Sequence, residues 1–132
     1  MIGLDTNVLV RHIMQDDPLQ SPKASRIIER HLTEEDPGFI SLATMLESAW
    51  VLENIYGLSR QELAQAIETI LQITTFAVQN EKEVHAAMLA FRTGHGSFDD
   101  ALIGALGLWA GCTSTLTFDR KASRLQGFRL IS

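Results

Sequence analysis

The sequence contains little of what stabilises small secreted proteins or anchors membrane proteins. It has a single cysteine, Cys112, among 132 residues, so no internal disulfide can form, which suits a reducing compartment. No apolar run approaches the ~20 residues that a membrane-spanning helix needs. Met1 leads directly into the apolar residues 2–4, with no basic region or cleavage pattern, which argues against a signal peptide. We therefore expect a cytoplasmic protein without a membrane span.

Positive charge is also scarce, because 11 Lys and Arg stand against 16 Asp and Glu, a formal net charge of -5. This argues against a broad basic surface that binds nucleic acid by counterion release alone. It does not exclude a nuclease, since carboxylates that hold divalent cations are nearly neutral once loaded. The chain shows no repeat, low-complexity stretch or linker, and its length suits one domain over residues 1–132.

Apolar residues recur with alternating strand-like and helical spacing along the whole chain. A short apolar run bounded by turn residues predicts a buried strand, and apolar positions three or four residues apart predict a helix. Strands that alternate with helices indicate an α/β fold with a short parallel β-sheet flanked by α-helices. The predicted strands cover residues 2–4, 39–41, 74–78, 115–117 and 128–131, and the predicted helices cover 8–13, 22–32, 42–58, 60–71, 81–91 and 97–112.

Four acidic residues fall where such a fold places its binding sites. Asp5 follows the first strand, Asp119 follows a later one, Glu47 lies in the helix after the second strand, and Asp100 lies in the first turn of the helix after Gly96. Binding sites of open α/β sheets collect at the carboxyl ends of the strands. We therefore expect the four carboxylates to converge at one sheet edge, where they suit Mg²⁺ or Mn²⁺. Such a site predicts phosphoryl-transfer chemistry.

Each acid also has a purely structural explanation. Asp5 and Asp119 precede a helix and a turn that they can cap, and the patterns T-x-x-E and S-x-x-D place Glu47 and Asp100 in potential capping boxes. Four acids in such positions are nevertheless harder to explain as four independent caps than as one site.

Three segments resemble motifs of the PIN domain family, and in particular of its VapC-type toxins. Asp5–Arg11 (DTNVLVR) resembles the opening motif, Ser97–Ile103 (SFDDALI) the third-acid motif and Thr117–Asp119 (TFD) the fourth, while Glu47 matches the second acid. The resemblance spans residues 3–131. It implies a PIN-like fold, RNA cleavage that depends on Mg²⁺ or Mn²⁺, homodimers, and neutralisation by a co-expressed antitoxin protein.

Roles for individual residues follow from position and from this resemblance. The predicted catalytic and metal-binding residues are Asp5, Glu47, Asp100 and Asp119. Helical periodicity does not choose between Asp99 and Asp100, but the resemblance implies Asp100, because the acid of the family motif directly precedes A-x-I. Neighbouring polar side chains can orient these acids or metal-bound water by hydrogen bonds, and basic side chains nearby can contact RNA phosphates. The predicted supporting residues are Thr6, Asn7 and Thr117, and the phosphate-contact candidates, which are otherwise solvated surface charges, are Arg11, Arg120 and Lys121.

Two alternatives remain open at this stage. One is a Mg²⁺-dependent phosphatase or receiver-like α/β domain, although the phosphatases require D-x-D and this chain has D-T-N at residues 5–7. The other is a PIN-fold binding module without catalytic activity, which the loss of one acid would favour, but all four acids are present.

Overall fold

The computed structural model describes residues 1–132 and confirms the α/β fold class. All strand pairs are parallel, and they form one three-stranded sheet in the order β1-β2-β3 and one two-stranded sheet, β4-β5. The strands are β1 (Ile2–Gly3), β2 (Gly38–Ile40), β3 (Phe76–Val78), β4 (Thr115–Thr117) and β5 (Phe128–Leu130). The α-helices are α1 (Thr6–Met14), α2 (Gln20–Arg26), α3 (Leu42–Asn54), α4 (Arg60–Gln72), α5 (Glu81–Arg92) and α6 (Phe98–Trp109), with a π-helical turn at Ile27–His31 and a 3-10 turn at Ala122–Arg124.

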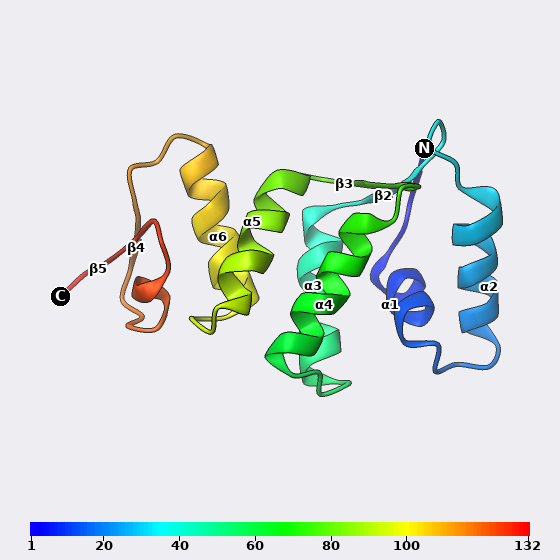
Figure 1. The fold of residues 1–132 in the computed structure, drawn as a ribbon, viewed down its shortest axis with the longest axis horizontal. Helices are drawn as coiled ribbons and strands as arrows, with labels where there is room; N and C mark the ends of the chain where they lie inside the picture. The colour runs from blue at the N-terminus through cyan, green and yellow to red at the C-terminus, as the bar shows by residue number, and fades with distance from the viewer.

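The helices stand side by side in a row, and the two sheets lie at different places along it (Figure 1). Strands β1 to β3 lie with α1 to α4, whereas β4 and β5 lie beyond α6, so the two termini are at opposite ends of the molecule. The four carboxylates were expected to converge at one edge of one sheet, whereas Asp5 and Asp119 follow strands of two different sheets. None of the helices combines the length and apolar character needed to cross a bilayer.

Small residues on α6 explain why β4 and β5 pack on this helix. A Cβ atom at Gly104 would lie 2.5 Å from the Phe128 ring, and one at Gly107 would lie 2.7 Å from the hydroxyl of Thr115. A larger residue at either position would force the Phe128 ring or the Thr115 side chain to shift. The last two strands are therefore held by α6, while β1 keeps β2 as its only strand neighbour.

One apolar core connects the two ends of the row. It includes Leu9 of α1, Leu63 and Ile67 of α4, Phe91 of α5 and Leu102 of α6, all almost fully buried. Helix α4 begins with the predicted capping box, in which the Ser59 amide donates to the Glu62 carboxylate (2.9 Å) and the Glu62 amide to the Ser59 hydroxyl (3.2 Å). Complete burial stabilises each apolar side chain of the core by roughly 1.5–3 kcal/mol.

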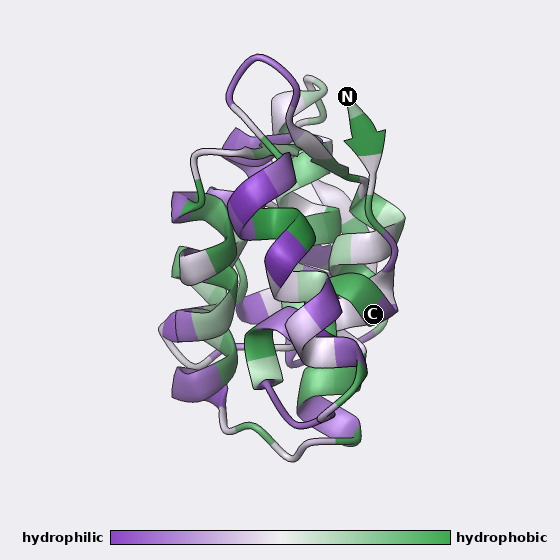
Figure 2. Cartoon of the chain, turned by 90° about the vertical axis from the view of Figure 1, so that its right-hand side faces the viewer, coloured by the Kyte–Doolittle hydropathy of each residue, from purple (hydrophilic) through white to green (hydrophobic).

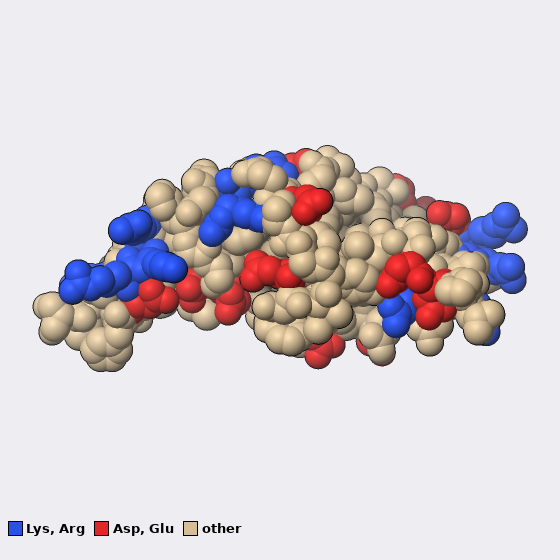
Figure 3. All heavy atoms as spheres, turned by 90° about the horizontal axis from the view of Figure 1, so that it is seen from below, with Lys and Arg blue, Asp and Glu red and all other residues tan.

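Charge and apolar character are unevenly distributed over the surface. Lys and Arg side chains lie at both ends of the molecule, the end with β4 and β5 included, and acidic side chains spread over the region between them (Figure 3). At the other end, strand β1 is apolar although it lies at the surface beside the N-terminus (Figure 2).

Stability is expected to fall between about pH 7 and pH 5 because of His12. Burial lowers the pKa of this side chain below its ordinary value of 6.5, an effect partly offset by the Glu29 carboxylate. Below pH 6.5 the unfolded chain takes up a proton that the folded chain resists, so the free energy of unfolding decreases with falling pH. Denaturant unfolding at pH 7.5 and 5.5 should show this slope in the wild type and a weaker slope in His12→Asn. An equal slope in both would contradict the assignment.

Two acidic groups with lowered pKa values, Asp17 and Glu62, act at lower pH. Backbone N–H donors from Gln20 and Leu19 lower the pKa of Asp17 below 3.8, and the Ser59 amide lowers that of Glu62 below 4.5. Carboxylates with lowered pKa values lose their stabilising effect only as the pH falls below their ordinary values.

Candidate active site

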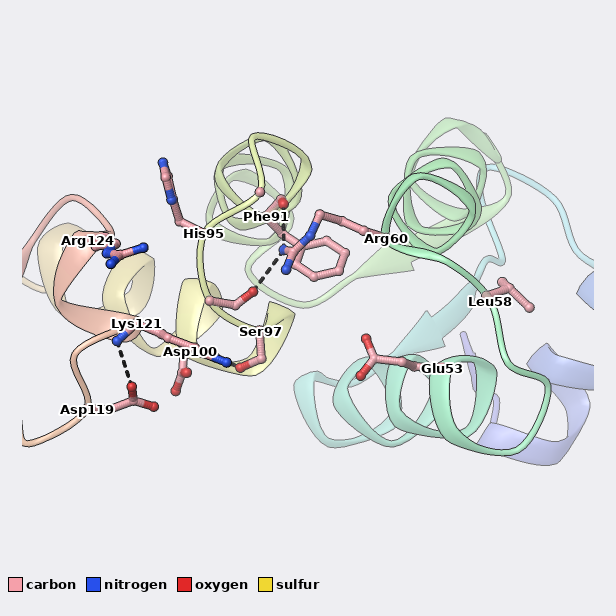
Figure 4. Close-up of a pocket in the computed structure, with 12 residues that line it drawn as sticks. Glu53, Leu58, Arg60, Phe91, His95, Ser97, Asp100, Asp119, Lys121 and Arg124 are labelled. Carbon is pink, nitrogen blue, oxygen red and sulfur yellow. Dashed lines mark hydrogen bonds between the residues drawn. The ribbon is translucent and has the colours of Figure 1, made fainter.

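Asp100 and Asp119 lie together at the edge of an open pocket of about 690 Å³ between the α4–α5 region and the β4–β5 unit (Figure 4). Asp100 projects from the first turn of α6, and Asp119 follows β4 by two residues. The two acids come from segments almost twenty residues apart, and they meet because β4 and β5 pack on α6.

The carboxylate of Asp119 is held by the backbone of its own turn. Its Oδ1 atom accepts hydrogen bonds from the amides of Lys121 (2.8 Å) and Ala122 (3.4 Å). The Thr117 hydroxyl accepts one from the Asp119 amide (3.0 Å). Asp119 thus caps the turn as its structural explanation required, yet its second oxygen keeps no protein partner.

A helix cap positions Asp100, but the Asp100 carboxylate takes no part in that cap. The Ser97 hydroxyl accepts a hydrogen bond from the Asp100 amide (3.2 Å), which fixes the first turn of α6. The Asp100 carboxylate does not return a bond to the Ser97 amide, so the predicted capping box is incomplete. Neither Asp100 nor Asp119 forms an ion pair, although the chain has three others. Both carboxylates are therefore available to a cation.

Asp5 and Glu47 lie elsewhere in this chain. Asp5 caps α1 by accepting from the Val8 amide (3.2 Å) and lines a shallow pocket between α1 and α2. Glu47 is exposed on α3 and lines a third pocket together with Asp99. No three His, Cys, Asp or Glu side chains come close enough together to hold a metal ion. The structure thus brings together two of the four predicted acids.

The capping box that the sequence suggested at Glu47 is wrong. Helix α3 begins at Leu42 and is capped by Ser41, whose hydroxyl accepts from the Thr44 amide (3.1 Å). The helix begins a turn earlier than T-x-x-E implies, so Glu47 lies inside it. Its side chain forms no ion pair and serves no cap.

The remaining predicted site residues differ in their exposure and in the hydrogen bonds that they already form. Thr6 is buried and Asn7 exposed, both in the first turn of α1 beside Asp5. The Arg11 guanidinium donates to Gln20 (2.9 Å) and to the Tyr56 hydroxyl (2.9 Å), so it ties α1 to α2 and to the end of α3. Arg120 and Lys121 are exposed next to Asp119 and remain free to contact a phosphate.

Sequence reasoning missed several residues that line the pocket of Asp100 and Asp119, above all Arg60. Its Nη1 atom donates to the carbonyl oxygens of Phe91 (3.0 Å) and Gly96 (2.8 Å), and its guanidinium carbon lies 4.5 Å from the centre of the Phe91 ring. Arg60 thereby holds the loop that leads into α6 (Figure 4). As the first residue of a predicted helix it carried no sequence signal. The other residues missed are Glu53, His95 and Arg124.

The donor set of the pocket fits a hard divalent cation. Mg²⁺ is usually bound by one or two carboxylates and completes its shell with waters and substrate phosphates. Asp100 and Asp119 supply two carboxylates that are free of ion pairs, in a pocket open to solvent.

Comparison with known proteins identifies the family of the chain. A family model described as PIN domain matches residues 2–127, and no curated protein matches the chain significantly. PIN domains are generally nucleases and typically use a divalent metal. The match extends from the strand before Asp5 past the turn after Asp119, so the chain belongs to the PIN domain family.

Proposed function

We propose that this protein is an endoribonuclease that requires Mg²⁺ or Mn²⁺ and cleaves RNA phosphodiester bonds. The observation that carries the proposal is the pairing of Asp100 and Asp119 in one open pocket without a cationic partner for either carboxylate. An acid with a purely structural role at a helix start usually caps the helix or forms an ion pair. The Asp100 carboxylate does neither, since only the Asp100 amide takes part in the cap of α6.

The residues around this pocket suit a phosphodiester substrate. Lys121 and Arg124 line it and are exposed, and Arg120 is adjacent in sequence, so the three can bind the RNA backbone on either side of the scissile phosphate. Thr117 and the turn amides hold Asp119, while Ser97 and Arg60 hold the segment that carries Asp100. A metal ion bound by the two carboxylates would stabilise charge on the phosphate and lower the pKa of a bound water.

Asp5 and Glu47 are the other two proposed metal ligands, and in this chain they line pockets other than that of Asp100 and Asp119. Asp5 lies at the carboxyl end of β1, and Glu47 lies on the helix that follows β2. Both are exposed and neither forms an ion pair. Thr6 and Asn7, adjacent to Asp5, are proposed to orient its carboxylate or a metal-bound water.

The biological role we propose is that of the toxin in a toxin–antitoxin pair, acting as a homodimer in the cytoplasm. This rests on the resemblance of residues 5–11, 97–103 and 117–119 to VapC-type motifs. An acidic pocket of this kind can accept a basic side chain of an antitoxin by charge-assisted hydrogen bonds. An antitoxin encoded beside this protein should co-purify with it, and Asp100→Asn should weaken the complex.

An RNA cleavage assay with mapped ends tests the proposed activity. The wild type should cleave with Mg²⁺ or Mn²⁺ and lose cleavage in EDTA, and Asp5→Asn should lose it in the presence of metal. Saturating Mn²⁺ should also raise the melting temperature, because 100 Kd of a ligand that binds only the folded state stabilises it by about 2.7 kcal/mol. Metal binding without cleavage of any RNA would indicate a binding module instead. Full activity of Asp5→Asn would remove Asp5 from the site.

A further inference from the structure

We propose that the exposed face of α2 and of the π-helical turn after it is a docking surface for the phosphate backbone of RNA. This surface, the basic stripe, consists of Lys23, Arg26 and Arg30. The RNA bound here is the substrate of the proposed function, on which this inference rests, but docking can be measured without any cleavage.

The three cations of the basic stripe lie on one face of the segment. They follow one another at intervals of three and four residues, and such positions are neighbours on a helix surface. The opposite face is buried through Ser21, Ala24 and Ile28, whereas all three cationic side chains are exposed. From Lys23 to Arg30 the row is roughly 10 Å long, at the helical rise of about 1.5 Å per residue.

No acidic side chain of the protein neutralises the basic stripe. The three ion pairs of the chain involve the N-terminus, Arg11 and Arg92. The one acid of the segment, Glu29, raises the pKa of His12 on α1 and forms no ion pair with the stripe. Cations that remain in solvent are available to phosphates, and the counterions released on contact favour binding of a polyanion.

The basic stripe is a local feature on an acidic protein. Residues 20–31 contain three Lys or Arg and one Glu, a formal charge of +2, whereas the whole chain carries -5, so the rest of the chain carries -7. Lys and Arg side chains gather at the α2 end of the molecule (Figures 1 and 3). A concentrated positive surface attracts a polyanion that the rest of such a protein repels.

The basic stripe leads into a pocket that the proposed function already uses. Lys23 lines the pocket of about 320 Å³ between α1 and α2, together with Arg11 and the proposed metal ligand Asp5. A backbone bound along the stripe therefore continues toward a carboxylate proposed to act on phosphodiester bonds. This continuity favours RNA over an acidic protein as the partner.

An anionic membrane is a less suitable partner for this face. Helices that bind a lipid interface insert an apolar face into it. Here Ala24 and Ile28 are buried in the protein, which leaves Leu19 and Ile27 as the exposed large apolar side chains of the region. The stripe thus offers phosphates three cations but offers lipid tails little apolar area.

The π-helical turn at Ile27–His31 is a second unusual feature of the same surface. It ends with a hydrogen bond from the Leu32 amide to the Ile27 carbonyl (3.1 Å), one residue wider than in an α-helix. Single π-helical turns are rare and occur frequently at functional sites. Here the turn presents Arg30 and His31 to solvent.

RNA binding without metal tests the docking surface. The full chain is titrated into a labelled single-stranded RNA of mixed sequence in EDTA, and fluorescence anisotropy gives Kd between about 50 and 200 mM salt. The triple variant Lys23→Gln, Arg26→Gln, Arg30→Gln should bind about tenfold or more weakly than the wild type. The slope of log affinity against log salt should be smaller by about 2, since each contact to a single-stranded phosphate contributes about 0.7. An unchanged Kd and slope would overturn the inference.

Lys82 provides a matched control. It is an exposed cation in the first turn of α5, it forms no ion pair, and α5 lies apart from α2 in the helix row (Figure 1). Arg26→Glu and Lys82→Glu change the net charge equally, yet only Arg26→Glu should weaken RNA binding strongly. Equal losses would show that total charge governs binding and would contradict a local docking surface. Melting curves establish that both variants are folded.

Cleavage kinetics and lipid binding separate the remaining outcomes. With an active wild type, the triple variant should act on KM rather than on kcat, because it removes binding and leaves the acids unchanged. A wild type that binds RNA through the stripe but cleaves none contradicts the proposed function and leaves the inference standing. An active wild type whose KM and Kd do not respond to the triple substitution does the reverse. Stripe-dependent binding to vesicles of anionic phospholipid, with RNA binding that does not depend on the stripe, would assign this surface to a membrane and overturn the inference.

Discussion

Replacement of Asp100 by asparagine is expected to lower the rate of RNA cleavage by about 100-fold or more, whereas Asp99→Asn should stay within about threefold of the wild type. Asp100 lines the pocket that holds Asp119, whereas Asp99 is exposed and lines the neighbouring pocket. Adjacent residues on a helix point about 100° apart, so the two carboxylates cannot serve the same metal ion. Loss of a ligand costs at least as much as the 10–100-fold typical of residues that orient ligands.

The same pair of variants excludes a purely structural role for Asp100. Ser97 provides the cap of α6, and the Asp100 carboxylate contributes no bond to it. We therefore expect both variants to unfold within about 1 kcal/mol of the wild type without metal, since an exposed acid in a first turn contributes roughly 0.3–1 kcal/mol. Initial cleavage rates with Mn²⁺ and melting curves without metal measure the two effects. A greater loss of activity in Asp99→Asn would reverse the assignment.

Arg60→Met is expected to lower the free energy of unfolding by roughly 2–4 kcal/mol. It removes two hydrogen bonds from a charged donor to the carbonyls of Phe91 and Gly96, and bonds to charged groups contribute about 1.5–3 kcal/mol each. The contact of the guanidinium with the Phe91 ring adds about 0.5–1 kcal/mol at a partly exposed site. Because Arg60 is partly exposed, solvent screens these contacts, and the expected loss lies below the sum of these ranges.

A matched control for Arg60 lies next to it in the chain. Gln61 is exposed and donates only one long bond, 3.4 Å, to the Arg92 carbonyl. Gln61→Met should therefore change stability by less than about 0.5 kcal/mol. Arg60→Met should also lower cleavage, because the loop that it holds leads directly into the turn that carries Asp100. Denaturant unfolding of both variants measures the difference, and equal stabilities would show that Arg60 does not anchor the loop.

Local rules predicted the elements of this fold well. The Ser59–Glu62 capping box forms as the pattern indicated, and Leu63, Ile67 and Ile70 of the same helix are buried as their spacing predicted. Strand positions, and the places of Asp5 and Asp119 just beyond strand ends, also follow from short apolar runs. These features depend on residues within a few positions of one another, and such interactions can be read from a single sequence.

Which of these elements become neighbours was decided only by the tertiary structure. Strands of two or three residues form too few hydrogen bonds to specify their own partners, so packing decides. Gly104 and Gly107 admit Phe128 and Thr115 onto α6, which places β4 and β5 there and brings Asp119 to Asp100. Arg60 enters the same pocket through bonds to residues more than thirty positions away. Position along the chain identifies the four acids as candidate site residues, but only contacts between distant segments determine which of their carboxylates lie in one pocket.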